Sequence, residues 1–163
     1  MLFFRILPVW VFIFAMELMG KSHERASKSF EMTKGYEMFI HYQPNPCGRS
    51  VGDCAVRAVS AALGITWEEV FDILVQFARN MCDMPSSDQV WGAVLRSKGF
   101  YRMSIPLNCP DCYTVEKFCE DRPRGKYVLG LGGHVTTVVN GCLFDSWDSS
   151  NEIPICMWYM KGE

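Results

Sequence analysis

The sequence has no excess of charge of either sign, because 16 lysines and arginines stand against 18 acidic residues, for a net charge of −2. Proteins that bind nucleic acid carry a basic patch or stripe, so this balance predicts that nucleic acid is not a partner. Internal repeats and low-complexity segments are also absent, which excludes solenoid and low-complexity disordered architectures. With 163 residues, of which 49% are hydrophobic, the chain is long enough to bury the core of one domain.

Long hydrophobic runs are missing as well. The longest uninterrupted one, residues 6–16, is shorter than the roughly 20 residues that a membrane-spanning helix needs. It has the length of a signal-peptide core and follows Arg5, but no small-x-small cleavage motif comes after it. Residues 1–19 therefore leave a secreted or membrane-anchored protein open as an alternative, beside that of a packed N-terminal helix.

The composition changes after this segment, and the change sets the expected domain boundary. We expect a hydrophobic leader and a polar linker over residues 1–37, and one globular domain over residues 38–163. A third interpretation of the leader is a translation start at Met32 or Met38, with the upstream stretch not part of the working protein.

Capping motifs and apolar periodicity predict four helices, and β-branched or apolar runs predict five strands that mostly follow them. Two motifs of the capping-box type, Thr66–Glu69 and Ser86–Gln89, mark helix starts. The fold class expected from this order is α+β, with N-terminal helices packed on a C-terminal antiparallel sheet. The expected helices cover residues 54–63, 67–78, 87–96 and 114–119, and the strands cover 101–105, 126–131, 134–139, 142–147 and 155–159.

Cys54 lies at the first turn of the first expected helix. The unpaired N–H groups and the positive end of the helix dipole stabilise a thiolate at that place, and the same N–H groups can bind a developing oxyanion. Asp53 works against the thiolate unless its carboxylate caps the helix. The alternative is that Cys54 is a small buried residue of an alanine-rich helix.

A hairpin supplies a base and an orienting acid. Asn140-Gly141 between two apolar runs predicts a two-residue type I′ turn. The register that follows puts His134 and Asp145 on one face as diagonal neighbours, about 7 Å apart or less at Cβ. Asp148 falls on the other face, and Trp147 lies directly opposite His134, where it can shield the ion pair. A nucleophile, a base and an orienter therefore converge from independent local patterns.

These residues resemble the papain-like cysteine peptidase superfamily, over about residues 43–159. The nucleophile of that family opens the central helix, its histidine starts a strand, and an Asn or Asp follows on the next strand, in the order of Cys54, His134 and Asp145. The segment 52–58, Gly-Asp-Cys-Ala-Val-Arg-Ala, is similar to the nucleophile segment of ovarian-tumour-type deubiquitinases. His134-Val135 with an acid on the return strand also resembles the double-glycine leader peptidases. The Gly-Asp-Cys and Trp-Asp-Ser-Ser patterns are similar to those of small uncharacterised proteins of gut bacteria and their phages.

The resemblance implies a papain-like fold and a side-chain donor for the oxyanion. Many relatives use a glutamine six residues before the nucleophile, and Gly48 stands there in this chain. The candidate substitutes are Gln43 and Asn45, or backbone N–H groups of the loop 48–53.

The remaining cysteines leave a metal site open. Cys109 and Cys112 form a single CxxC motif, and Cys119 follows seven residues later. A four-ligand zinc site would need Cys82 or Cys47 in addition. A thioredoxin-type redox pair is excluded, because the motif does not open a helix in a βαβ unit. The alternative is a structural loop with free thiols, and we expect neither metal nor cofactor.

Three functions follow from these patterns. The leading hypothesis is a cysteine peptidase, or a related thiol-dependent acyl-transfer hydrolase, that cleaves a peptide or isopeptide bond in a peptide or protein substrate. The alternatives are a non-catalytic binding or regulatory module with the same fold and a small zinc-stabilised adaptor. Because the leading hypothesis needs a reduced thiol, it makes a disulfide scaffold the least expected use of the cysteines. It favours a reducing, cytoplasmic setting.

Overall fold

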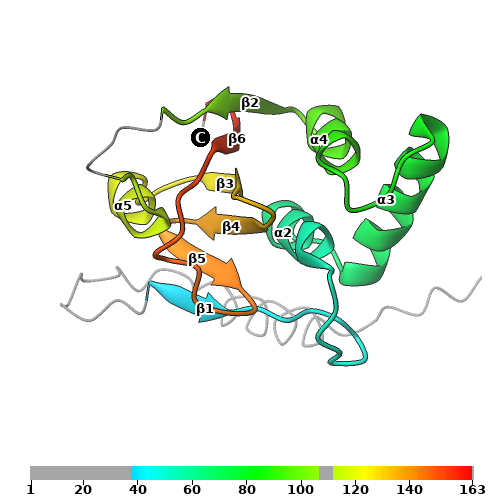
Figure 1. Cartoon of the computed structure of the whole chain (residues 1–163), viewed down its shortest axis with the longest axis horizontal. Coiled ribbons are helices and arrows are strands. Elements are labelled where there is room, and N and C mark those ends of the chain that lie inside the picture. Colours follow the sequence, from blue (N-terminus) through cyan, green and yellow to red (C-terminus); the bar gives the residue numbers. More distant parts are fainter. Residues whose placement is uncertain (1–37, 107–111, 163) are drawn as a thin grey trace, which may run out of the picture. The chain divides into compact units, whose positions relative to one another are not determined.

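The computed structural model describes residues 38–106 and 112–162, so the expected leader and linker, residues 1–37, lie outside it. The described residues form one compact unit. It is a mixed α+β structure in which the described residues form four helices and one six-stranded sheet (Figure 1). No helix of the described part of the chain is long and apolar enough to cross a membrane.

The sheet has the strand order β1-β5-β4-β3-β6-β2. Neighbouring strands pair antiparallel, except for β1, which runs parallel to β5. The strands are β1 (Phe39–His41), β2 (Phe100–Ser104), β3 (Lys126–Gly130), β4 (Val135–Val139), β5 (Cys142–Asp145) and β6 (Cys156–Met160).

The expected purely antiparallel, C-terminal sheet is wrong in one respect. β1 precedes all the described helices and pairs parallel with β5, which makes the sheet mixed. The strand expected at residues 101–105, before the last helix, is present as β2. The strand β1 has only three residues and its pattern is half-exposed, so it carries no alternation that a sequence could reveal. Its position depends on tertiary pairing, with Leu143 N donating to Met38 O at 2.6 Å and Tyr42 N donating to Asp145 O at 2.7 Å.

Three helices lie on one side of the sheet (Figure 1). Of these, α2 (Cys54–Leu63) and α4 (Asp88–Ser97) contact the strands, and α3 (Trp67–Met81) packs on α2 and α4. Their apolar stripes meet alternate residues of the strands, among them Val128, Val135 and Trp158. Because strand side chains alternate between faces, this core uses only one parity of each strand.

The opposite face is covered by α5 (Val115–Asp121). Val115 and Phe118 of this helix pack on Leu129, Val138 and Leu143, all of which are buried. Two layers of helices therefore enclose the sheet, and β4 lies inside it with partners on both sides. A strand held on both edges and both faces is a rigid support for any side chain at its end.

The helix starts follow the capping chemistry, with one shift. Thr66 and Glu69 form the expected capping box of α3, and Thr114 caps α5. The N-cap of α4 is Ser87 rather than Ser86, with its hydroxyl accepting from Val90 N at 3.3 Å. The Ser87 hydroxyl also donates to Asp83 Oδ2 at 2.5 Å.

Candidate active site

Cys54 is the first residue of α2 and is half-buried. Asp53 occupies the N-cap position, but no side chain makes a capping hydrogen bond there. Asp53 is thus the expected N-cap residue by position, but its carboxylate does not cap the helix. That carboxylate instead binds the Arg57 guanidinium and accepts from Trp67 Nε1 at 2.9 Å. As a result, the first turn of α2 presents its N–H groups without a side-chain acceptor, beside the thiol.

His134 stands directly before β4, at the end of a tight connection from β3. The connection closes when Leu131 N donates to His134 O at 2.8 Å, and Gly133 takes a positive φ of 81° within it. Thr137 Oγ1 of the same strand donates to Ala58 O of α2 at 2.7 Å. This buried hydrogen bond fixes β4 against α2, so His134 is held near Cys54.

The β4–β5 hairpin has the predicted turn and register. Asn140 and Gly141 both have positive φ, 51° and 76°, as a type I′ turn requires. Val139 pairs with Cys142, and Val138 with Leu143. The same register brings Asp145 to the histidine, and His134 Nε2 lies 2.7 Å from Asp145 Oδ2.

Asp145 is only 2% exposed, and its carboxylate is surrounded by donors. Ser149 Oγ donates to Oδ2 at 2.8 Å, and Ser146 N donates to Oδ1 at 2.7 Å. Burial raises the pKa of Asp145, but hydrogen bonds from His134 and Ser149 outweigh it and leave the pKa below the ordinary value. An ionised carboxylate only accepts hydrogen bonds, so His134 Nε2 carries a hydrogen and Nδ1 remains for the thiol.

The thiol and the imidazole shift each other's pKa in opposite directions. The pKa of Cys54 is lowered, first by its hydrogen bond with His134 and against the effect of burial. The pKa of His134 is raised to about 9, first by the hydrogen bond with Asp145 and then by the one with Cys54. Both shifts favour a thiolate–imidazolium pair over a neutral thiol and imidazole.

Two further residues of the site were missed by sequence reasoning. Arg57, one turn after Cys54, is buried and reaches both acids, binding Asp53 and lying 3.6 Å from Asp145 Oδ1 through Nη2. An Asp–Arg pair at i, i+4, with the arginine on an otherwise apolar helix face, is the pattern that could have revealed it. Ser149 is completely buried, and no local pattern distinguishes it from an ordinary loop serine.

Trp147 and Asp148 lie in the loop after β5, because the strand ends at Asp145 and does not continue through Trp147 as expected. The Trp147 ring still lies 5.4 Å from the His134 ring, centroid to centroid, and is 44% exposed, so it covers one side of the imidazole. Asp148 Oδ1 accepts from Ser150 N at 3.0 Å, whereas Asp145 makes the contact with His134. Asp145 is thus the acid that the fold brings to the histidine.

Gln43 and Asn45 are both engaged within the loop that precedes α2. Gln43 Nε2 donates to Arg49 O at 3.3 Å, and its buried Oε1 has no partner. Asn45 Oδ1 accepts from Cys47 N at 3.0 Å. Among the described residues, no hydrogen bond joins Gln43 or Asn45 to Cys54. The role of these two side chains as oxyanion donors therefore stays a prediction. The uncapped N–H groups of α2 are the donors that the fold leaves beside the thiol.

The cysteines of the predicted zinc alternative do not form a ligand cluster within residues 38–106 and 112–162, where no group of three or more His, Cys, Asp or Glu could hold a metal ion. Cys109 lies outside the described residues. Burial raises the pKa of Cys119 to about 12, which opposes the thiolate form that zinc binds. Cys54, Cys112 and Cys119 are all free thiols.

Comparisons of this chain with protein-family models, with curated proteins and with solved structures found no match in any of the three.

Proposed function

We propose that the protein is a cysteine peptidase, or a related thiol-dependent acyl-transfer hydrolase, with Cys54 as nucleophile, His134 as acid–base and Asp145 as its orienter. The observation that carries the proposal is the 2.7 Å contact between His134 Nε2 and Asp145 Oδ2, on an imidazole that also lowers the pKa of the helix-start thiol of Cys54. An imidazole fixed by a carboxylate on one nitrogen and by a thiol on the other is the arrangement that covalent acyl transfer needs.

The steps follow from the positions of the protons. The Cys54 thiolate attacks the carbonyl carbon, and the electron pair of the C=O bond moves to oxygen, where the N–H groups of the first turn of α2 lie closest. His134 then gives its Nδ1 proton to the leaving amine, and the C–N bond breaks to leave a thioester on Cys54. A water molecule then gives a proton to Nδ1 while its oxygen attacks the thioester carbon; the C–S bond breaks, which releases the acid and restores the Cys54 thiolate beside the His134 imidazolium. Asp145 holds the ring and stabilises the imidazolium throughout.

A papain-like fold is part of the proposal. It is supported by the order of the elements, with the nucleophile opening α2, the histidine at the start of β4 and the acid at the end of β5. The substrate on this proposal is a peptide or protein. A thiolate nucleophile also calls for a reducing compartment.

The test is covalent labelling of the full chain by a thiol-reactive peptide electrophile, followed by mass mapping of the modified cysteine. We expect one modified residue, Cys54, and complete loss of rapid labelling in Cys54→Ala. Cys112→Ala is the matched control, because this thiol is also half-buried and free but has no histidine partner among its described contacts. Rapid labelling that survives in Cys54→Ala would overturn the assignment.

A second measurement separates an enzyme from a non-catalytic module of the same fold. Iodoacetamide alkylation at pH 6 measures the thiolate directly, since the thiolate is the nucleophile. We expect Cys54 to react faster than free cysteine at this pH, and His134→Ala to remove the excess rate. A Cys54 thiol no faster than free cysteine would favour the non-catalytic module.

A further inference from the structure

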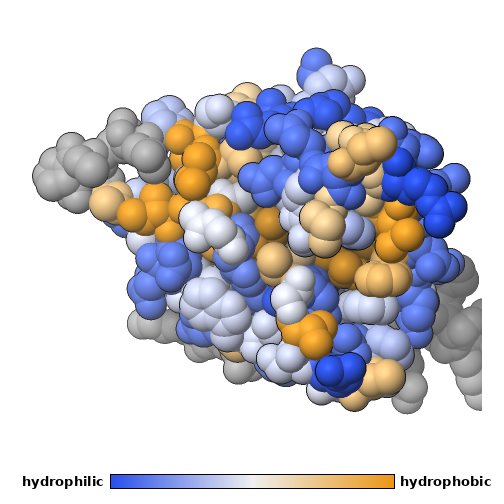
Figure 2. Space-filling model, turned by 45° about the vertical axis from the view of Figure 1, so that its right-hand side comes forward, coloured by the Kyte–Doolittle hydropathy of each residue, from blue (hydrophilic) through white to orange (hydrophobic). Residues whose placement is uncertain are grey.

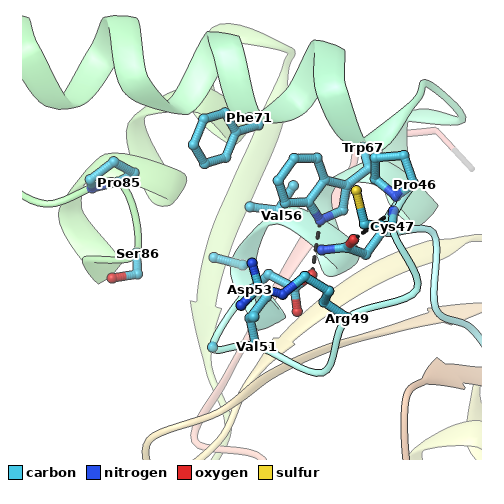
Figure 3. Close-up of a pocket in the computed structure, with 13 residues that line it drawn as sticks. Pro46, Cys47, Arg49, Val51, Asp53, Val56, Trp67, Phe71, Pro85 and Ser86 are labelled. Carbon is cyan, nitrogen blue, oxygen red and sulfur yellow. Dashed lines mark hydrogen bonds between the residues drawn. The ribbon is translucent and has the colours of Figure 1, made fainter.

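A pocket with a volume of about 440 Å³ opens beside the start of the nucleophile helix (Figure 3). Its walls come from four segments: the loop before α2, the start of α2, the start of α3, and the connection between α3 and α4. Asp53 and Ala55, the two neighbours of Cys54 along the chain, both line it. A volume of this size holds one large side chain of a bound peptide together with part of its backbone.

The lining of the pocket is mainly apolar and aromatic. The Trp67 and Phe71 rings of α3 stack 4.9 Å apart with an interplanar angle of 9°, and Figure 3 shows them on one wall, with Val51 across from them. Phe71 and Val51 are each 41% exposed, so both still present apolar surface to a ligand. The face of the molecule in Figure 2 mixes hydrophilic side chains with groups of apolar ones.

The place of the pocket relative to the reaction decides which half of a substrate it meets. His134 must reach the leaving amine to protonate it, so the leaving half lies towards β4 and β5. No residue of these two strands lines the pocket. The acyl half of the substrate, which extends from Sγ on the other side, is therefore the half that passes the pocket.

The charges of the lining determine which side chains are excluded. Asp53 is the one carboxylate that lines the pocket, and its oxygens are already taken by Arg57 and Trp67 Nε1. Arg49 contributes a cation to the same lining, and none of the ion pairs found among the described residues involves it. A lysine or arginine of the substrate would meet a like charge there without a free carboxylate, which is unfavourable.

We propose that this pocket is a specificity site that binds an aromatic or branched aliphatic side chain from the acyl half of the substrate and rejects a basic one. The proposal rests on the proposed function for the direction of the substrate, whereas the binding preference itself comes from the lining. The occupant buries its apolar surface against the Trp67–Phe71 pair and Val51.

The first experiment measures binding without chemistry. The Cys54→Ala variant of the full chain, which cannot react, is titrated by calorimetry with N-acetyl peptide amides that carry Phe, Leu, Ala or Lys at one position at a time. We expect Phe and Leu to bind at least about tenfold more tightly than Ala or Lys at one position. Equal binding of Phe, Ala and Lys at every position would overturn the pocket assignment, whatever the fate of the proposed function.

The second experiment uses a matched pair of substitutions on α3. Phe71 and Met81 have nearly the same exposure, 41% and 42%, but only Phe71 lines the pocket. In the Cys54→Ala background, Phe71→Ser should remove the preference for Phe over Lys, and Met81→Ser should keep it. A preference that both variants retain would place the binding site elsewhere.

A third measurement keeps the two proposals apart. Phe71→Ser in the otherwise unchanged chain should alkylate with iodoacetamide as fast as the parent, because the small reagent does not need the pocket. Its reaction with a phenylalanyl peptide electrophile should slow by about tenfold or more. Equal slowing with both reagents would mean that Phe71 acts on the thiol itself and not on substrate choice.

Discussion

Arg57 joins Asp53, the residue before Cys54, to Asp145, the carboxylate that contacts His134. Its guanidinium binds Asp53 through Nη1, and Nη2 lies 3.6 Å from Asp145 Oδ1, with all three side chains at most 7% exposed. The positive charge therefore balances two buried carboxylates within one turn of Cys54. It also explains why Asp53 does not raise the pKa of Cys54, since Arg57 contributes to lowering that pKa.

Replacement of Arg57 by methionine should destabilise the fold severely. The variant leaves Asp53 and Asp145 buried without their shared cation, and loss of one partner of a buried pair costs about 3–5 kcal/mol. Denaturant unfolding measures the change in the free energy of unfolding. The double variant Asp53→Asn/Arg57→Met removes one of the two stranded charges and should recover part of the loss. An Arg57→Met variant as stable as the parent would show that the arginine does not balance these acids.

The pH dependence should differ between two reactions of the same thiol. Below the lowered pKa of Cys54 the thiol is protonated, so both iodoacetamide alkylation and peptide hydrolysis should slow as the pH falls. Above a pH of about 9, His134 loses its proton and can no longer serve as the acid for the leaving amine. Hydrolysis of a peptide amide should therefore fall on the alkaline side, and alkylation should not.

Rate profiles from pH 5 to pH 10 for both reactions check this expectation. His134→Gln is the control, since it keeps a polar side chain without a titrating group, and it should move the acid limb of alkylation towards the ordinary thiol pKa. An alkaline fall in the alkylation rate of the parent would contradict the assignment, because alkylation needs no proton donor.

Asp145→Asn should separate the role of charge from that of shape. The hydrogen bond with Asp145 is the largest cause of the raised His134 pKa, so the variant should lower that pKa and, through it, raise the pKa of Cys54. The thiolate–imidazolium pair is then depopulated, and kcat/KM for a peptide substrate should fall by about 10²- to 10⁴-fold. Asp148→Asn is the matched control, because the Asp148 carboxylate accepts a hydrogen bond from Ser150 N and makes none with His134 among the described residues. Equal loss in the two variants would remove Asp145 from the site.

Patterns among neighbouring residues were enough to predict that His134 and Asp145 meet, whereas β1 and the contacts of Asp53 depend on residues far away in the chain. The Asn140-Gly141 turn determines the register of the hairpin, and the register determines that His134 meets Asp145; each step needs only neighbours in the chain. The short strand β1 could not be predicted in the same way, because it forms only against β5. The choice of Asp53 between capping α2 and binding Arg57 also depends on Trp67, which lies 14 residues away.

Gly92→Ala tests whether the α4 layer is packed against the sheet as tightly as the fold indicates. A Cβ at Gly92 would lie 2.8 Å from Trp158 Cζ2 and 3.1 Å from Cη2, and the Trp158 ring is 2% exposed, so it has little room to move. Alanine is the better helix former by about 1 kcal/mol, but overpacking of a core costs about 1–3 kcal/mol. The clash should therefore outweigh the propensity, and we expect a lower free energy of unfolding.

Gly132→Ala is the control, because nothing lies within 4 Å of its added Cβ, and its stability should stay within about 0.5 kcal/mol of the parent. A Gly92→Ala variant more stable than the parent would show that α4 and Trp158 are not in close contact.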